Sequence, residues 1–187
     1  LPVVTTLHGT DITLVGKHPS YKPAVTFSIN KSDVVTSVSE SLKKDTLSSF
    51  VVKNEINVIP NFIDIDLYNI DDQCNRSQIA PNNEKVVIHI SNMRPVKRIP
   101  DVIEIFHRIT REEDAILLML GDGPERERAE QQVRDLGIAE KVRFLGKTTE
   151  VRRLLCMSDL FLLTSQNESF GLVALEALAA KVPVISS

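Results

Sequence analysis

Short runs of apolar, mostly β-branched residues recur along the chain and alternate with segments of helical periodicity. Most of these runs are apolar throughout, which is typical of parallel strands that helices cover on both faces. Eight strands are therefore expected, at residues 3–7, 34–38, 56–59, 86–90, 115–120, 142–145, 160–164 and 182–185.

The segments between these runs have the spacing of amphipathic helices. In residues 99–110 the apolar positions recur every three or four residues. Residues 125–136 are strongly charged and end at Gly137, a residue that commonly stops a helix. A shorter helix is expected at residues 150–156. Strands that alternate with helices of this length predict an α/β fold with doubly wound parallel sheets.

One polar stretch, residues 71–84, interrupts this alternation. It is rich in Asn and nearly free of apolar residues, which is typical of a junction between domains. Residues 1–70 are then the C-terminal part of a first domain, and residues 85–187 form most of a second. Both ends of the chain fall in strand-like runs. We therefore expect an internal piece of a larger protein, with an incomplete first domain and a truncated second one.

Composition narrows the classes of function. The 187 residues are 42% hydrophobic and 25% charged, enough apolar material for a packed core, and the net charge is −3. The chain has no overall excess of positive charge of the kind that binds nucleic acid. No apolar run reaches the roughly 18–20 residues that span a bilayer. Cys74 and Cys156 have neither CxxC spacing nor a disulfide-rich context. We expect reduced thiols in a cytoplasmic protein that has no nucleic-acid partner and no integral membrane segment.

Two carboxylates, Glu168 and Glu176, stand on either side of a predicted helix start near Gly171. This start follows a strand directly, and open α/β sheets bind ligands at that edge, where free N–H groups favour phosphates or sugar hydroxyls. The neighbours of Glu176 at helical spacing are all apolar: Leu172, Val173, Ala179 and Ala180. A carboxylate on an apolar face needs a partner. Solvent, an internal arginine and the hydroxyls of a ligand are the alternatives.

Three further turns follow predicted strands. The loop at residues 91–98 carries three cations in five positions, which would suit a diphosphate or form a solvated basic loop. His8 follows the first strand and is either a polar contact, a proton carrier or a structural histidine. The Gly-Asp-Gly sequence at residues 121–123 predicts a tight strand-to-helix turn.

The E-x7-E spacing of Glu168 and Glu176, with Phe170-Gly171 between them, resembles the signature of the retaining glycosyltransferases of family four. Further motifs of that family are matched in order at residues 58–64, 120–124, 144–146 and 158–165. The resemblance covers essentially the whole chain. It implies the GT-B fold, in which two Rossmann-like domains with doubly wound parallel sheets face each other.

The resemblance implies a role for each matching residue. Glu168 would hold a hydroxyl of the donor sugar and Glu176 the ribose hydroxyls of the nucleotide. Lys97 would bind the diphosphate and His8 would lie beside the donor sugar, so that His8, Lys97 and Glu168 form the predicted catalytic set. Backbone groups that would contact the donor are those of Gly146 and Lys147 at the base, and of Ser169, Phe170, Gly171, Leu172 and Val173 at the sugar and phosphates.

One position departs from the family pattern. The family usually has an arginine five residues before the lysine, where this chain has Asn92, with Arg94 two residues later. Either Arg94 supplies the charge from a shifted position, or Asn92 hydrogen-bonds to the phosphate.

Within the family, the sequences at residues 8–11, 91–98 and 167–172 most resemble members of the bacillithiol pathway. Those enzymes join N-acetylglucosamine from UDP-N-acetylglucosamine to L-malate. The resemblance implies a small dicarboxylate acceptor close to Thr10 and Asp11, and front-face transfer with UDP as the leaving group. The UDP-sugar is then a substrate, and no cofactor or metal is predicted. A homo-oligomer remains an open alternative.

Three rival functions stay open. The first is a family-four transferase with a polysaccharide or a lipid-linked acceptor. The second is a UDP-N-acetylglucosamine 2-epimerase built on the same two-domain scaffold. The third is a non-catalytic module that binds nucleotide sugars.

Overall fold

The computed structural model describes most of the chain: residues 1–16, 18–68 and 74–187. Of Asp11 and Leu14 it describes the backbone alone. Within these residues there are eight β-strands, and every strand pairing is parallel. The prediction of an α/β chain with parallel sheets is therefore confirmed.

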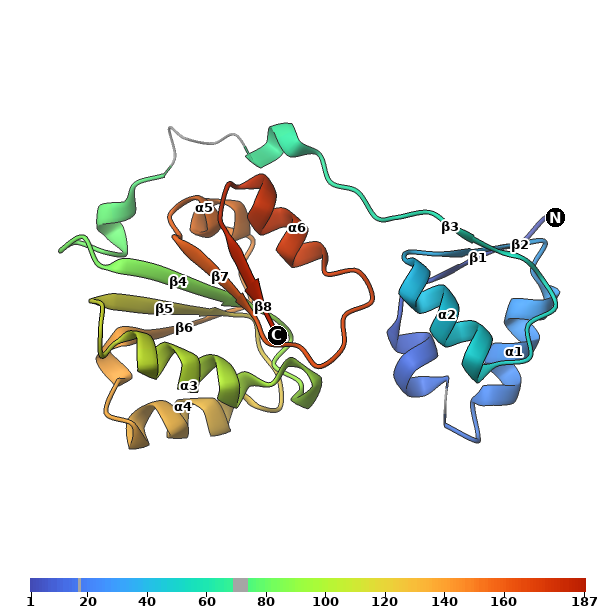
Figure 1. Ribbon diagram of the computed structural model, residues 1–187, viewed down its shortest axis with the longest axis horizontal. Coiled ribbons are helices and arrows are strands. Elements are labelled where there is room, and N and C mark those ends of the chain that lie inside the picture. The colour runs from blue at the N-terminus through green and yellow to red at the C-terminus, as the bar shows by residue number, and fades with distance from the viewer. Residues whose placement is uncertain (17, 69–73) are drawn as a thin grey trace. The chain divides into compact units, whose positions relative to one another are not determined.

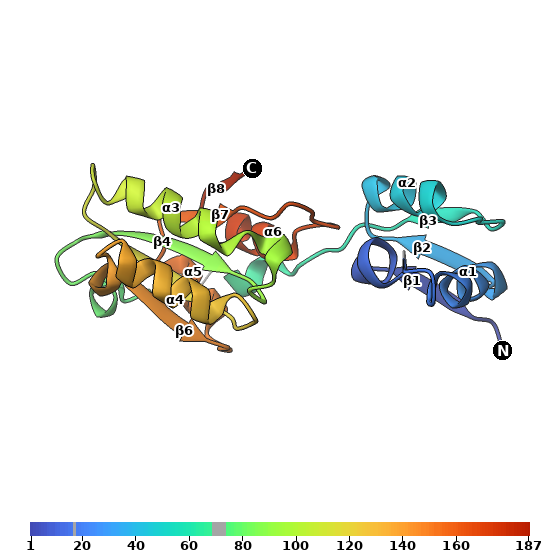
Figure 2. The ribbon, with the colours of Figure 1, turned by 90° about the horizontal axis from the view of Figure 1, so that it is seen from below.

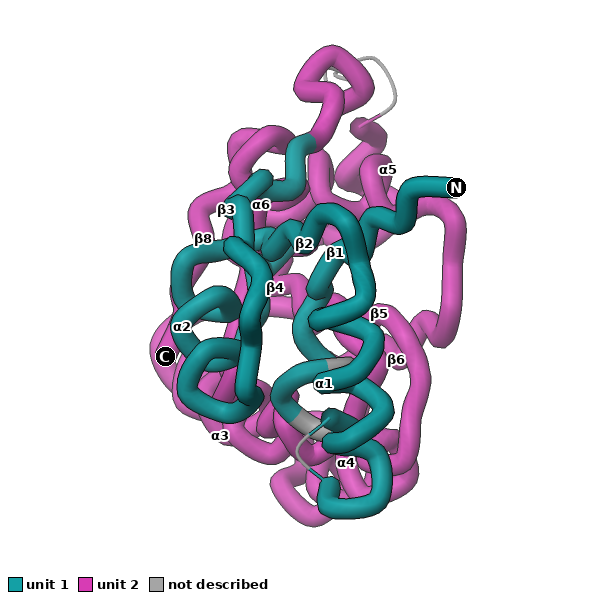
Figure 3. The backbone as a smooth tube through the Cα atoms, turned by 90° about the vertical axis from the view of Figure 1, so that its right-hand side faces the viewer, with its two compact units in different colours: residues 1–62, 168–172 teal, residues 63–167, 173–187 magenta. Residues whose placement is uncertain are grey.

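The described residues divide into two compact units, which Figure 3 colours separately. The first unit comprises Leu1–Phe62 and also takes in Glu168–Leu172, a segment from much later in the chain. The second comprises Ile63–Asn167 and Val173–Ser187. Residues 74–84, the described part of the polar stretch, belong to the second unit.

The first unit is built on a small parallel sheet. Its strands lie in the order β1 (Val4–Leu7), β2 (Val34–Ser37) and β3 (Ile56–Val58). A π-helix, η1 (Asp11–Val15), follows β1, and the helices α1 (Lys22–Lys31) and α2 (Glu40–Ser49) pack on one face of the sheet (Figure 1). The core between helices and sheet consists of Leu7, Ile12, Ile29, Val35, Val38, Leu42, Phe50 and Ile56.

The pattern of apolar positions does not predict α1 or α2, because each buries one large apolar side chain, Ile29 or Leu42. Local signals at their starts account for them instead. Pro23 stands in the first turn of α1, where the N–H that it lacks would have no partner within the helix. Ser39 caps α2, since its hydroxyl accepts the N–H of Leu42 at 3.2 Å.

The second unit is a larger doubly wound sheet. Its strands are β4 (Lys85–Ile90), β5 (Ala115–Leu120), β6 (Val142–Gly146), β7 (Leu160–Leu163) and β8 (Val184–Ser186). The helices α3 (Ile99–Ile109) and α4 (Arg126–Asp135) cover one face, and α5 (Val151–Cys156) and α6 (Leu172–Ala179) cover the other (Figures 1 and 2). Alternate residues of β4 therefore enter different cores: Val87 lies on the α3 side, whereas Val86 and Ile88 lie on the α5 side.

The strand order β6-β5-β4-β7-β8 makes β4 the strand from which the chain winds in both directions. Ligands of open α/β sheets bind at the carboxyl ends of the strands, where the winding direction reverses. In this sheet that point lies between the ends of β4 and β7. The two loops singled out from the sequence follow these two strands.

Hydrogen bonds of Arg76 hold the described part of the polar stretch against the second sheet. Its guanidinium donates to both carboxylate oxygens of Asp159, at 2.9 Å and 2.6 Å, and to the carbonyl of Glu84 at 2.7 Å. The N–H of Val86, in β4, donates to the same carboxylate at 2.7 Å. Nearby, Ile79 is 7% exposed and joins the core under α5. The described part of the stretch is polar in composition, but it is packed.

Asp159→Asn is expected to lower the free energy of unfolding by roughly 1–2 kcal/mol near neutral pH, because charge-assisted hydrogen bonds to Arg76 are lost. Burial alone would raise the pKa of Asp159, but the hydrogen bonds from Arg76 and Val86 and the charge of Arg76 outweigh it and lower the pKa. The stabilisation is therefore complete above the unfolded-state pKa and is lost as the pH falls through the folded-state pKa.

Denaturant unfolding of the full-length wild-type and Asp159→Asn proteins, from about pH 7 down to about pH 2, measures this effect. The two stabilities should converge at the acid end, where Asp159 is protonated. A difference that stayed constant across the range would contradict the charge-based explanation.

The prediction of reduced thiols is wrong: Cys74 and Cys156 form a disulfide. The two residues are 82 positions apart in the sequence, but the fold lays the segment after residue 74 against α5, so that their Cα atoms are 5.8 Å apart. This separation is within the range of roughly 4.4–6.8 Å found for disulfides. Motif spacing could not predict the pair, because its proximity arises from packing of the second unit.

Candidate functional site

Two loops of the second unit meet at the carboxyl edge of its sheet. One, residues 91–98, follows β4 and contains the 3-10 turn η5 (Pro95–Lys97), and the other, residues 164–167, follows β7. The hydroxyl of Thr164 donates to the carbonyl of Lys97 at 2.8 Å, and the N–H of Gln166 donates to the carbonyl of Val96 at 2.8 Å. Thr164 is 3% exposed, which shields its hydrogen bond from water. The backbone thus joins the predicted diphosphate loop to the segment that leads to the glutamates.

The side chains of the 91–98 loop divide between core and solvent. Met93 is fully buried and adopts a left-handed φ of 41°. Asn92 and Arg94 on either side of it are exposed, and Lys97 is half-buried. Arg98, the third cation, pairs with an acidic residue in the first turn of α3. Arg98 is thus engaged within the unit, and the ligands predicted for phosphate remain Asn92, Arg94 and Lys97.

The Gly121-Asp122-Gly123 turn after β5 packs against the backbone of the 91–98 loop. A Cβ at Gly121 would lie 1.8 Å from the carbonyl oxygen of Ser91, and one at Gly123 would lie 1.9 Å from that of Asn92. The carboxylate of Asp122 accepts the N–H of Gly123 at 2.9 Å. The glycines therefore serve the close approach of two loops.

The strand β6 ends at Gly146, the position predicted to meet the nucleotide base. Gly146 has a left-handed φ of 67°, and its carbonyl accepts the N–H of Gly121 at 2.8 Å. Lys147 is exposed. Arg126, which the sequence did not single out, lies beside this turn and donates to Glu130 at 2.9 Å. That hydrogen bond raises the pKa of Arg126, although burial opposes it.

The helix α6 begins directly after Gly171, which has a left-handed φ of 80°, as the sequence predicts. Glu176 on this helix is half-buried, and the hydroxyl of Tyr68 hydrogen-bonds to its carboxylate. Burial, the charge of Glu176 and this hydrogen bond raise the pKa of Tyr68, so that the hydroxyl keeps its proton at neutral pH. Tyr68 closes the 3-10 turn η2 (Ile65–Tyr68). Glu176 thus has a protein partner that sequence reasoning missed.

In the first unit, Ser169 lies against the end of β1 and the start of α2. A Cβ at Gly9 would lie 1.7 Å from the Ser169 Oγ, so the turn and the segment are in close contact. The Ser39 hydroxyl, which caps α2, donates to the carbonyl of Ser169 at 2.6 Å. Phe170 packs against the core of the unit. These contacts hold Ser169 and Phe170, two of the residues that are predicted to contact the donor, within the first unit.

His8 and Thr10, predicted beside the donor sugar and the acceptor, are both exposed on the turn after β1. Gly9 between them is buried, and its carbonyl accepts N–H groups from the start of η1. The side chain of Asp11, predicted near the acceptor, lies outside the described residues. Glu168 is exposed. The predicted catalytic set therefore divides, with His8 and Glu168 in the first unit and Lys97 in the second.

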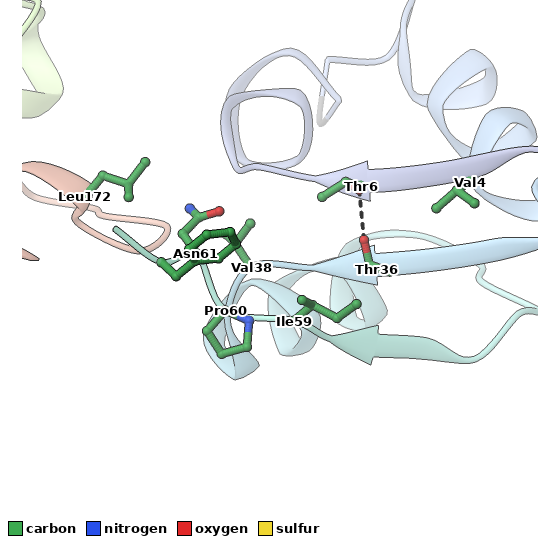
Figure 4. A pocket seen from close by; sticks show the side chains of 9 residues that line it. Val4, Thr6, Thr36, Val38, Ile59, Pro60, Asn61 and Leu172 are labelled. Carbon is green, nitrogen blue, oxygen red and sulfur yellow. Dashed lines mark hydrogen bonds between the residues drawn. The ribbon is translucent and has the colours of Figure 1, made fainter. Parts of the chain in front are cut away.

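A pocket of about 350 Å³ lies in the first unit, on the face of the sheet that carries Thr6 and Thr36 (Figure 4). The hydroxyls of these two threonines are 2.9 Å apart and hydrogen-bonded. The pocket is lined by Val4, Thr6, Thr36, Val38, Ile59, Pro60, Asn61, Phe62 and Leu172. These described lining residues include no charged side chain, so the pocket does not fit a diphosphate. Among the predicted site residues, Leu172 is the one that lines it.

The second unit thus brings Asn92, Arg94, Lys97 and Gly146 to one edge of its sheet, because the carboxyl ends of parallel strands lie together. Across the described ranges, His, Cys, Asp and Glu side chains form no group of three that could hold a metal ion. In the same ranges, each helix is too short or too polar to cross a membrane.

Two family models match the chain and together span most of it. The model described as Glycosyl transferases group 1 matches residues 71–187, and the model described as Glycosyltransferase Family 4 matches residues 1–67. The resemblance drawn from the two glutamates and the ordered motifs is therefore confirmed.

Individual relatives agree with these matches. The chain is 48% identical over 189 residues to N-acetyl-alpha-D-glucosaminyl L-malate synthase of Bacillus anthracis, covering all of this chain and 50% of that protein. The crystal structure of Anabaena HepE in complex with UDP and glucose superposes with a TM-score of 0.85 at 26% identity, over 99% of this chain and 52% of that one. A variant of Staphylococcus aureus TarM, in complex with fondaparinux, α-GlcNAc-glycerol and UDP, superposes with a TM-score of 0.79 at 26% identity. The match covers 98% of this chain and 36% of that one.

The chain spans about half the length of the Bacillus relative and of HepE. These structural neighbours have the GT-B fold, which confirms the predicted fold class.

Proposed function

Because the chain belongs to the glycosyl transferases of group 1, we propose that it carries the donor-binding residues of a retaining glycosyltransferase that moves N-acetylglucosamine from UDP-N-acetylglucosamine to L-malate. The observation that carries the proposal is the 48% identity to N-acetyl-alpha-D-glucosaminyl L-malate synthase over the whole chain. The edge of the second sheet supports it, since a basic loop and a helix start follow adjacent strands there.

In this proposal the second unit binds UDP. Lys97, with Arg94 or Asn92, stabilises the diphosphate, and the N-terminus of α6 adds N–H groups and its dipole. Glu176 accepts the ribose hydroxyls, and the backbone at Gly146 and Lys147 meets the base. The half-buried position of Glu176 supports this role, because a carboxylate that is partly shielded from water forms stronger hydrogen bonds.

Transfer with retention places the new bond on the face that UDP leaves. The anomeric carbon loses its bond to the β-phosphate oxygen and gains one to the malate hydroxyl, whose proton passes to the departing diphosphate. Glu168 holds a sugar hydroxyl, and His8 lies beside the sugar. The protein then acts by orienting the reactants and by stabilising the negative charge of the leaving group.

The acceptor side is proposed to involve Thr10 and Asp11. The exposed hydroxyl-bearing Thr10 suits a hydrogen bond to malate. Asp11 would repel malate carboxylates, so a direct contact with them is not proposed for it. We place recognition of the carboxylates outside these two residues.

Incubating the full-length protein with UDP-N-acetylglucosamine and L-malate tests the proposal. Release of UDP that depends on malate, with an α-linked product by NMR, is the expected result. UDP release with a polysaccharide or a lipid-linked sugar, but not with malate, would mean that this other molecule is the acceptor. Epimerised sugar without any acceptor would point to the epimerase, and UDP binding without turnover would point to a binding module.

Glu176→Gln is expected to weaken UDP binding by roughly 1–3 kcal/mol, because charged hydrogen bonds to the ribose become neutral ones. Titration calorimetry with UDP measures the change. Tyr68→Phe is the matched control, because it removes the protein partner of Glu176 but keeps the carboxylate. The effect of Tyr68→Phe on UDP affinity should be smaller than that of Glu176→Gln. Unchanged UDP affinity in Glu176→Gln would rule out the ribose role.

Chelation is expected to leave the activity of the full-length protein unchanged, because Lys97, Arg94 and the α6 N-terminus are proposed to supply the positive charge at the diphosphate. Initial rates with and without excess EDTA provide the measurement. Activity that EDTA abolished and Mg²⁺ restored would contradict this assignment of charge.

A further inference from the structure

His89 is a buried imidazole to which neither the motifs nor the proposed reaction assigns a role. It stands in β4, two residues before the loop that begins with Ser91, and is fully buried. Its neighbour across the sheet in register is Met119, an apolar residue of β5. A polar ring in such surroundings is costly unless its nitrogens are hydrogen-bonded.

Both ring nitrogens have partners, and the chemistry of those partners determines the direction of each bond. Nδ1 lies 2.9 Å from the carbonyl oxygen of Leu162 in β7. A carbonyl can only accept, so Nδ1 carries the hydrogen and the neutral ring has its lone pair on Nε2. The Ser91 hydroxyl lies 2.8 Å from Nε2 and donates to it. The Ser91 Oγ in turn accepts the N–H of Met93 at 3.2 Å.

This chain of bonds begins beside the paired stretch of β4 and β7. The register of β4 with β7 runs through Val87–Leu160 and Ile88–Phe161. One residue further, the His89 ring reaches the carbonyl of Leu162. The side chain therefore connects the two strands whose carboxyl ends flank the switch point of the sheet.

The other end of the chain of bonds lies in the loop that carries the proposed phosphate ligands. Met93 holds a left-handed φ of 41°, which is unfavourable for a side chain of its kind. Its N–H is held by Ser91, its side chain is fully buried, and its carbonyl accepts the N–H of Glu125 at 3.0 Å. With Met93 fixed inward, the neighbouring Asn92 and Arg94 are exposed.

We propose that His89 and Ser91 are positioning residues for the diphosphate: through Met93 they set the backbone from which Asn92, Arg94 and Lys97 reach the phosphates. In this proposal neither residue contacts the substrate. Thr164 fixes the far end of the same loop at the carbonyl of Lys97, so the loop is held from β4 at one end and from β7 at the other. This inference rests on the proposed binding of UDP by the loop.

The test compares UDP with uridine, which lacks the phosphates, by calorimetric titration of the full-length protein. Ser91→Ala removes the acceptor of the Met93 N–H and the donor to His89. We expect about tenfold weaker binding of UDP, comparable to the loss of one hydrogen bond between the loop and the diphosphate. The affinity for uridine should change by less than about twofold. Ser91→Thr keeps the hydroxyl and should restore UDP binding. Ser158→Ala, which removes a hydroxyl bonded to the Leu154 carbonyl at 2.7 Å in the same unit, is the matched control.

His89→Asn provides a second test, because its amide keeps a donor toward Leu162 but has no group at the position of Nε2. It should show the same selective loss for UDP as Ser91→Ala. Equal weakening of UDP and uridine, or loss of the folded protein in both variants, would overturn the positioning role. A wild-type protein that bound uridine and UDP equally would instead overturn the proposed diphosphate loop itself, and this inference with it.

Discussion

Replacing Lys97 by alanine in the full-length protein is expected to lower kcat by about 100- to 1000-fold, the usual cost of losing one group that stabilises developing charge. The melting temperature should change little. The loop is held through the backbone: the carbonyl of Lys97 accepts the Thr164 hydroxyl at 2.8 Å, and the carbonyl of Val96 accepts the N–H of Gln166. These bonds survive the loss of the lysine side chain, so the variant should keep the loop and lose the charge.

Steady-state kinetics and thermal unfolding of the same preparations separate the two effects. Lys141→Ala is the matched control, since that lysine precedes β6 at the opposite edge of the sheet and pairs with Asp114 at 3.1 Å on the surface. It should lose almost no activity. Lys97→Arg retains a charge at the site and should keep part of the rate. If Lys97→Ala lost activity only in proportion to its thermal stability, the lysine would be structural.

The apolar runs of the sequence predicted the strands well, most clearly for β4, β5 and β7, which are largely buried in the second unit. All eight expected runs are strands in the described residues, with ends that shift by at most two residues. The last strand begins two residues later than expected, at Val184. Val182 is only 3% exposed, but it packs into the core from the loop before β8. Burial and strand geometry are different properties: Val182 is buried but lies outside the strand, whereas Ile185 lies in β8 and is 57% exposed.

Features that depend on two distant segments could not be predicted from the sequence. The Cys74–Cys156 disulfide is one, and the hydrogen bond of Tyr68 to Glu176 is another. In both cases the residues lie in the segment after Phe62 and on a helix of the second unit. The composition of residues 71–84 indicates exposure, whereas Arg76 holds its described part against Asp159. The sequence indicates candidate residues for chemistry, but their partners depend on packing.

The loop after β4 likewise combines residues that the sequence makes visible with partners that only the fold brings together. The cations Arg94 and Lys97 are visible as a motif, because their charge differs from that of the surrounding residues. The groups that shape the loop are less visible: His89 is an isolated histidine within a strand, and Gly121 belongs to a different turn. Their contribution is a matter of contact distances and hydrogen-bond directions, which only the three-dimensional arrangement contains.

Gly121→Ala is expected to destabilise the full-length protein by roughly 3–5 kcal/mol, which for a domain of this size lowers the melting temperature by about 6–20 °C. Two costs add at this position. Its φ of 103° is a conformation that side chains rarely adopt. A Cβ there would also lie 1.8 Å from the carbonyl oxygen of Ser91, a backbone atom that cannot rotate away. The N–H of Gly121 is bonded to Gly146 at 2.8 Å, so the turn cannot retreat toward β6 without losing that bond.

Two other glycines separate these costs. Gly137 also has a positive φ, of 68°, but a Cβ there would meet nothing within 4 Å, so Gly137→Ala should cost about 1 kcal/mol. Gly123 lacks the positive φ, but a Cβ would lie 1.9 Å from the carbonyl oxygen of Asn92, so Gly123→Ala measures the clash alone. Thermal and denaturant unfolding of the three variants should rank Gly121→Ala as the most destabilised and Gly137→Ala as the least. Equal losses at Gly121 and Gly137 would mean that the 91–98 loop can move aside, and that the close approach of the two turns does not hold it in place.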